Sequence, residues 1–300
     1  MTATFPLIPR RRVLGLAFGG LHSIRRGAGS DVAASRPYRP GDDVGKIDWP
    51  ASARLSLARG SDEFVVREHF AEEAPRVVVL CDRRPSMFAF GEPWPWLDKA
   101  EALRQATMLI GESAAAARGL LGYFDEGEAE PFWHPPRSEG ELALLDLDRP
   151  FRAPADTVAR GLRHLIEHPR DLPAGTFVFV LSDFLAEPER DDWLWALERR
   201  WEVVPVVIQD PVWEQSFPDV GGLVVAFSSP DDADGARLVR LSESEVERRR
   251  TENEERRRGL LGRLRALDLE PVLVSSHEHR DVLSSFLNWA DQRLFTRGRA

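Results

Sequence analysis

Residues 76–81 read RVVVLC, and this almost wholly apolar run decides the fold. A strand with one face in water alternates apolar and polar residues, so a run without that alternation indicates a strand buried on both faces. Three further runs of the same kind follow it along the chain: 120–124 (LLGYF), 176–181 (TFVFVL) and 203–208 (VVPVVI).

The segments between these strands carry apolar residues at helical spacing. Helices are expected at 97–118, 157–168, 190–200, 243–265 and 281–295, with further short strands at 222–227 and 270–275. Strands that alternate with helices predict a doubly wound, mostly parallel α/β sheet with helices on both faces.

The composition is that of a globular protein: 300 residues, of which 43% are hydrophobic and 30% charged. The longest apolar runs are strand-sized, which excludes an integral membrane protein. Cys81 is the single cysteine, so an intramolecular disulfide and a cysteine-based metal cluster are excluded. The arginine triplet at 10–12 precedes only a short apolar stretch without a cleavage site, and the chain is expected to be cytoplasmic.

Charge is spread unevenly along the chain. The formal net charge is −9, yet residues 1–60 hold ten basic and four acidic residues. Such a basic segment is suited to nucleic acid, and binding through the basic N-terminus is one alternative function. No extended basic stripe with interleaved aromatic residues follows, so pairing with the acidic remainder of the chain is the simpler interpretation.

Residues 35–55 read SRPYRPGDDVGKIDWPASARL. The prolines and glycine in this stretch predict short strands and turns across residues 30–70, without a long helix. A turn is expected at Pro40-Gly41, where the following aspartates accept backbone N–H groups. We also expect Asp48 to pair with Arg54 and Trp49 to be buried against the core.

Two interpretations of this stretch stay open. One is a rigid elbow braced by charges. The other is a docking surface that consists of Arg36, Tyr38, Asp42, Asp43 and Arg54.

The stretch resembles the signature of the domain-of-unknown-function family 58, R-x-Y-x-P-G-D-D-x-x-x-I-D-W-x-x-x-A-R, at eleven positions. The resemblance extends over roughly residues 15–295 and implies a von Willebrand factor A-like fold. It divides the chain into an N-terminal β-rich extension (1–74) and a von Willebrand A-like α/β domain (75–300). It also implies a MoxR-type AAA+ ATPase as partner, and a role in assembling or maturing a complex that contains an unknown client protein.

The same resemblance implies a metal site. A von Willebrand A domain holds a divalent cation at the carboxyl edge of its sheet with the pattern D-x-S-x-S, then a Thr and an Asp. The matching positions here are Asp82, Ser86, Thr157 and Asp183, whose oxygens suit Mg²⁺.

Arg84 departs from this pattern because it stands at the first serine. A guanidinium is always charged and cannot ligate a metal. Two carboxylates at close range need a cation between them, and that cation is either Mg²⁺ or Arg84. We expect the four predicted ligands to converge on one point in either case.

These features favour a non-enzymatic interaction module or adaptor. The rival hypothesis is a Mg²⁺-dependent hydrolase that uses Asp82 and Asp183. The sequence places no general base beside a nucleophile, and the expected nucleotide-binding and hydrolase motifs are absent from it.

Overall fold

The structure is a computed structural model that describes residues 3–10, 22–39, 44–61, 63–72, 74–88, 97–127, 130–137, 147, 149–227 and 237–297. The chain divides into two compact units. The larger consists of residues 1–10 and 76–300, and the smaller of residues 11–75.

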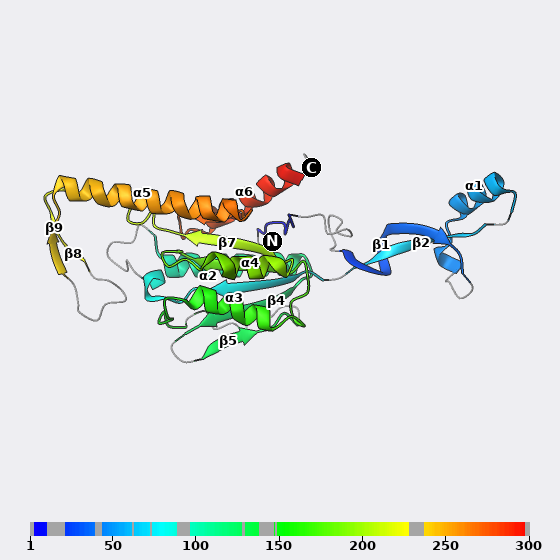
Figure 1. Cartoon of the computed structure of the whole chain (residues 1–300), viewed down its shortest axis with the longest axis horizontal. Coiled ribbons are helices and arrows are strands. Elements are labelled where there is room, and N and C mark those ends of the chain that lie inside the picture. The colour runs from blue at the N-terminus through cyan, green and yellow to red at the C-terminus, as the bar shows by residue number, and fades with distance from the viewer. Residues whose placement is uncertain are drawn as a thin grey trace. The chain divides into compact units, whose positions relative to one another are not determined.

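A six-stranded sheet forms the centre of the larger unit (Figure 1). Its strands are β3 (Arg76–Cys81), β4 (Leu120–Glu126), β5 (Pro131–His134), β6 (Phe177–Ser182), β7 (Glu202–Ile208) and β10 (Val272–Val274). Their order is β10-β7-β6-β3-β4-β5, and every neighbouring pair is parallel except β4 with β5. The predicted α/β architecture with a mostly parallel sheet is therefore confirmed, and the four apolar runs are adjacent strands.

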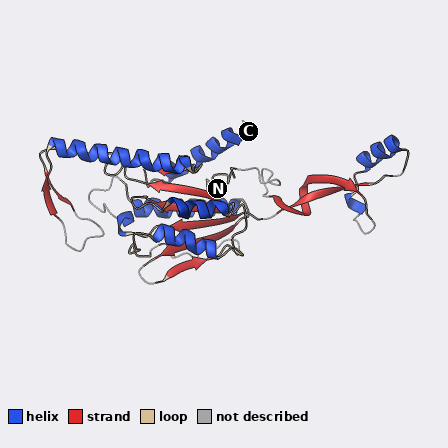
Figure 2. Ribbon diagram, in the orientation of Figure 1, coloured by secondary structure: helices blue, strands red, loops and turns tan. Residues whose placement is uncertain are grey.

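Helices cover both faces of this sheet (Figure 2). One face packs against α2 (Lys99–Ala116) and α6 (His279–Arg297), and the other against α3 (Thr157–Glu167), α4 (Arg190–Glu198) and α5 (Glu243–Ala266). Successive residues of β3 enter opposite cores: Val77 and Val79 lie in one, Val78 and Leu80 in the other. Burial on both faces explains why the strand sequences show no polar alternation.

A second, two-stranded antiparallel sheet precedes α5 in the larger unit. It consists of β8 (Val224–Phe227) and β9 (Arg237–Arg240). Among the described residues, no helix combines the length and the apolar character that a membrane crossing requires.

Residues 3–10 differ from the expected division, because they pack into the larger unit and not into the N-terminal extension. Phe5 is 3% exposed and stacks on Phe286 of α6 with ring centroids 4.6 Å apart. Arg10 forms an ion pair with Asp268, and its backbone N–H donates to Glu202 Oε2 at 2.9 Å. The first basic residue of the chain thus meets acidic groups of its own chain.

The smaller unit is built on an antiparallel pair, β1 (His22–Pro37) and β2 (Val65–Glu72), joined through the one-turn helix η1 (Val44–Lys46) and the helix α1 (Trp49–Arg59). The prediction of strands and turns alone was wrong, because α1 has 11 residues.

The sequence of α1 explains why it forms. Asp48 Oδ1 accepts the backbone N–H of Ala51 at 3.1 Å and caps the N-terminus. Pro50 lies in the first turn, where no backbone N–H is needed, so it favours the helix that it seemed to break. Gly60 ends the helix with a left-handed φ of 66°.

Candidate functional site

The carboxyl ends of β3 and β6 define the candidate site. These two strands are neighbours, and the chain leaves β3 for α2 on one face of the sheet and β6 for α4 on the other. Doubly wound sheets bind ligands at such a topological switch point, because the diverging loops leave an opening there. Asp82 follows β3 directly, and Asp183 follows β6, so the fold brings both carboxylates to this point.

Arg84 lies between the two carboxylates. Its Nη2 is 2.6 Å from Asp82 Oδ2 and 2.7 Å from Asp183 Oδ1, and its Nε is 2.9 Å from Asp82 Oδ2. Both aspartate side chains are fully buried, and the Arg84 side chain is 6% exposed. The guanidinium therefore points inward and bridges the two carboxylates with its single positive charge.

A second cation, Lys99, belongs to the same cluster. Its role there was not predicted from the sequence. Lys99 Nζ lies 3.2 Å from Asp183 Oδ2 and 2.6 Å from Glu214 Oε1, and all three groups are buried. Lys99 begins α2, whereas Glu214 follows β7. One signal was available, since Lys99 is one of only two lysines in the chain.

Local hydrogen bonds fix the loop that follows β6. Ser182 Oγ donates to Asp82 Oδ2 at 2.7 Å and accepts the backbone N–H of Phe184 at 2.9 Å. The backbone N–H of Leu185 donates to Asp183 Oδ1 at 3.0 Å, and Gln209 Nε2 donates to the Asp183 carbonyl oxygen at 2.7 Å. The position of Asp183 is thus set by its own loop and by the strand next to it.

Of the predicted ligands, the two aspartates are hydrogen-bonded to Arg84. Ser86 is buried close enough to Asp183 to help lower the pKa of that carboxyl. Its Oγ nevertheless has no hydrogen-bond partner of ordinary geometry among the described residues. Thr157 is buried in the first turn of α3, where its backbone N–H donates to the Pro154 carbonyl oxygen at 3.1 Å.

The electrostatics of the cluster reflect burial and pairing together. Burial raises the pKa of Asp82 and of Glu214 above their usual values, against the opposing effect of their cations. Burial also acts to raise the pKa of Asp183, but Lys99 and Arg84 outweigh it and hold that pKa below its usual value. Desolvation acts to lower the pKa of Arg84, and the two aspartates outweigh it and raise that pKa, so the guanidinium stays charged.

This arrangement does not fit the metal site that the sequence resemblance implies. Mg²⁺ needs oxygen ligands at about 2.0–2.1 Å in octahedral geometry. Arg84 Nη2 already lies within hydrogen-bond distance of both carboxylates, where such an ion would have to sit. Among the described residues, no group of three or more His, Cys, Asp or Glu side chains is placed to hold a metal.

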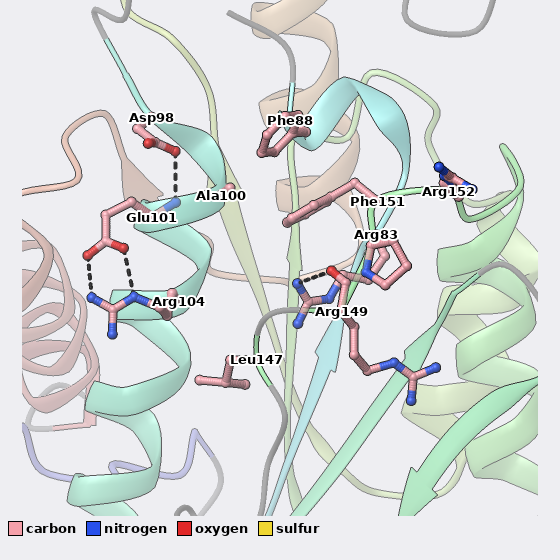
Figure 3. Close-up of a pocket in the computed structure, with 11 residues that line it drawn as sticks. Arg83, Phe88, Asp98, Ala100, Glu101, Arg104, Leu147, Arg149, Phe151 and Arg152 are labelled. Atoms are coloured by element: carbon pink, nitrogen blue, oxygen red, sulfur yellow. Dashed lines mark hydrogen bonds and ion pairs between the residues drawn. The ribbon is translucent and has the colours of Figure 1, made fainter. Parts of the chain in front are cut away.

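A cavity of about 490 Å³ opens beside the loop that carries Arg84 (Figure 3). Its walls include Phe88 and Phe151, which stack with ring centroids 5.7 Å apart. Its arginines have acidic partners: Arg104 Nη2 lies 2.6 Å from a Glu101 carboxylate oxygen, and Arg83 Nε lies 3.2 Å from Asp125 Oδ2. These two lining arginines are therefore paired with carboxylates.

The family-like signature lies in the smaller unit and is only partly as predicted. Trp49 is 57% exposed, so the prediction that it is buried was wrong. Trp49 is the first residue of α1. Its ring packs edge to face with that of Phe64, and the two ring centroids lie 6.1 Å apart. The Tyr38 ring also packs against Phe64, with ring centroids 6.4 Å apart. Phe64 is itself 44% exposed. We call Tyr38, Trp49 and Phe64 the aromatic surface.

The predicted charges around this surface have different fates. Asp48 caps α1, while Arg54 Nε donates to the Pro50 carbonyl oxygen at 3.1 Å on the exposed side of the helix. Arg36 is half-buried, and its Nη1 donates to the Pro37 carbonyl oxygen at 3.0 Å. The expected turn at 40–43, with Asp42 and Asp43, lies outside the described residues.

Comparisons with known proteins place the chain in a family. The uncharacterized protein Rv1480 of Mycobacterium tuberculosis (strain H37Rv) is 25% identical over 224 residues, which are 74% of this chain and 68% of the relative. The uncharacterized protein Mb1516 of Mycobacterium bovis matches equally well.

Two solved structures are also similar. They are a conserved hypothetical protein BatB from Bacteroides thetaiotaomicron (14% identity, TM-score 0.37) and an aerotolerance-related membrane protein from Bacteroides fragilis (10% identity, TM-score 0.38). They cover 72% and 73% of this chain and 99% of their own. The family model described as protein of unknown function DUF58 matches residues 34–259, and the chain belongs to that family.

Proposed function

We propose that this protein is a non-enzymatic interaction module that docks to its partner through the aromatic surface of the smaller unit. The observation that carries this proposal is the exposure of Trp49, which belongs to the family signature, and of Phe64, which packs against it. Large aromatic side chains left in water cost hydration free energy, and they are enriched among residues that dominate protein–protein binding. Arg54, on the same helix as Trp49, is of a second residue type common in such sites.

The buried cluster at the sheet edge argues against the rival hydrolase. A catalytic carboxylate must reach a substrate or an attacking water, yet Asp82 and Asp183 are fully buried and bonded to Arg84. Cys81 offers no alternative nucleophile, because burial raises the pKa of its thiol to about 11.

The finer fold assignment is part of the same proposal: the larger unit is a von Willebrand factor A-type domain whose metal-binding edge has changed. Two carboxylates at the ends of adjacent parallel strands, a serine four residues after the first and a threonine that opens a helix support it. The proposed partner is a MoxR-type AAA+ ATPase, and the proposed role is to bring a client protein to that ATPase for assembly or maturation.

An affinity measurement tests the docking proposal. The full chain is titrated with a purified MoxR-type ATPase from the same organism, in the presence of ATP. We expect Trp49→Ala and Phe64→Ala each to weaken binding at least tenfold, as is usual for aromatic residues central to an interface. Phe295→Ala is the matched control, because Phe295 is 78% exposed on α6 of the larger unit, and it should leave the affinity unchanged.

The possible outcomes separate the two parts of the proposal. Wild type without affinity for the ATPase would overturn the choice of partner. Binding that survives both aromatic substitutions would overturn the choice of surface.

A further inference from the structure

We propose that Arg84 is a tethered cation that takes the place of a divalent metal at the sheet edge, and that shortening it creates a Mg²⁺ site. The inference concerns the larger unit alone and does not depend on the docking proposal.

The first argument is geometric. Arg84 Nη2 has oxygens of Asp82, Asp183 and Ser182 within 3.3 Å. They come from the ends of two strands, which only the fold brings together. A Mg²⁺ ion about 2.1 Å from the same two carboxylate oxygens would overlap with this nitrogen. The guanidinium and the metal are therefore mutually exclusive occupants of one position.

The buried charges at the sheet edge also favour a tethered cation. Buried carboxylates without a counter-charge are strongly unfavourable, so the buried carboxylates of Asp82, Asp183 and Glu214 need cations beside them, and two cations lie there. Arg84 supplies one of them from the loop after β3, and Lys99 supplies the other from the start of α2. They divide the two oxygens of Asp183 between them, and Lys99 is shared with Glu214, whose Oε1 lies 2.6 Å from its Nζ.

The Ser86 hydroxyl offers a third oxygen at the same position. Buried hydroxyls are almost always hydrogen-bonded, yet Ser86 Oγ has no partner of ordinary geometry in the described part of the chain. It lies beside Asp183 and helps to lower the pKa of that carboxyl, so its oxygen is close to the carboxylate that Arg84 occupies. With a shorter residue at position 84, Asp82, Asp183 and Ser86 present three oxygens, and waters complete the octahedron.

The consequence is a sheet edge whose stability does not depend on divalent cations. Mg²⁺ and EDTA should leave the wild-type Tm unchanged, because the position is already filled. Ligand binding to the native state raises stability in proportion to ln(1 + [L]/Kd), so a created site should be visible as a Mg²⁺-dependent Tm.

The experiment compares wild type with Arg84→Ser by isothermal titration calorimetry and by thermal unfolding in Mg²⁺, Mn²⁺ and EDTA. We expect Arg84→Ser to bind Mg²⁺ at least about tenfold more tightly than wild type, and its Tm to rise with Mg²⁺. The matched control is Arg160→Ser, since Arg160 is 47% exposed and pairs with Glu126 outside the site. The double variant Arg84→Ser/Asp183→Asn should lose the gained binding.

Arg84→Gln guards against a variant that fails to fold, because its amide still donates a hydrogen bond and its oxygen can ligate a metal. Folding of either variant that requires Mg²⁺ supports the inference. Submillimolar Mg²⁺ binding by wild type would overturn it. So would variants that respond to Mg²⁺ no more than Arg160→Ser does.

Discussion

At the scale of single residues, the smaller unit depends on polar contacts that join α1 to β2. Ser52 is 3% exposed; its Oγ donates to the Asp48 carbonyl oxygen at 2.7 Å and accepts the backbone N–H of Val65 at 2.9 Å. The Asp48 side chain meanwhile caps the same helix. Ser52 thus links the first turn of α1 to the first residue of β2. This link positions Trp49 of α1 beside Phe64, which precedes β2.

Asp48→Ala should therefore lower the free energy of unfolding of the smaller unit by about 1 kcal/mol, the usual cost of a lost N-cap. Chemical denaturation followed by tryptophan fluorescence measures it. Asp48→Asn is the matched variant, because an asparagine oxygen accepts the same backbone N–H. Equal destabilisation by both substitutions would mean that charge, and not capping, is the contribution of Asp48.

At the scale of elements, α3 lies close to the sheet because residue 161 has no side chain. A Cβ at Gly161 would lie 2.7 Å from Leu80 Cδ1 and 2.9 Å from Phe124 Cε1. This close approach holds the start of α3, with Thr157, at the carboxyl edge of the sheet.

A pair of helical glycines makes this testable. Gly161→Ala should destabilise the larger unit by about 1–3 kcal/mol through overpacking. Gly262→Ala in α5, where a Cβ meets nothing within 4 Å, should be neutral or stabilise by up to about 1 kcal/mol. Thermal unfolding of both variants gives the comparison, and a stabilised Gly161→Ala would contradict the packing described.

Some elements of the fold could be predicted from a single sequence, and others could not. The buried strands were predictable because burial on both faces leaves apolar runs that no other local structure requires. The helix α1 was missed because Pro50 was weighed as a breaker, whereas the first turn of a helix tolerates it. The resemblance to a von Willebrand A domain, with Arg84 at a serine position, limited the cation between the aspartates to Mg²⁺ or Arg84. It could not find Lys99 or Glu214, which are 115 residues apart and meet only through tertiary packing.

At the scale of the whole molecule, the first residues of the chain are part of the larger unit's core. Phe5 contacts rings of β6 and α6, and its backbone N–H donates to Ser113 Oγ of α2 at 3.1 Å. Residues 3–10 thus pack on one face of the sheet, although along the chain residues 11–75 of the smaller unit separate them from β3.

Phe5→Ala should lower the stability of the larger unit by about 3–5 kcal/mol, the range for removing a buried phenylalanine. Hydrogen exchange of β3 and β6 reports on that unit specifically. The control is again Phe295→Ala, whose ring is exposed. Unchanged protection of β3 and β6 in Phe5→Ala would place residues 3–10 outside this core.

We propose that the aromatic surface binds the partner, while Arg84 and Lys99 fill the sheet edge. Hydrogen–deuterium exchange of the full chain, alone and with the MoxR-type ATPase, tests it most directly. We predict that complex formation slows exchange in α1 and around Phe64, and leaves the loops after β3 and β6 unchanged. Slowed exchange in the loops at Asp82 and Asp183, with α1 unaffected, would contradict the claim.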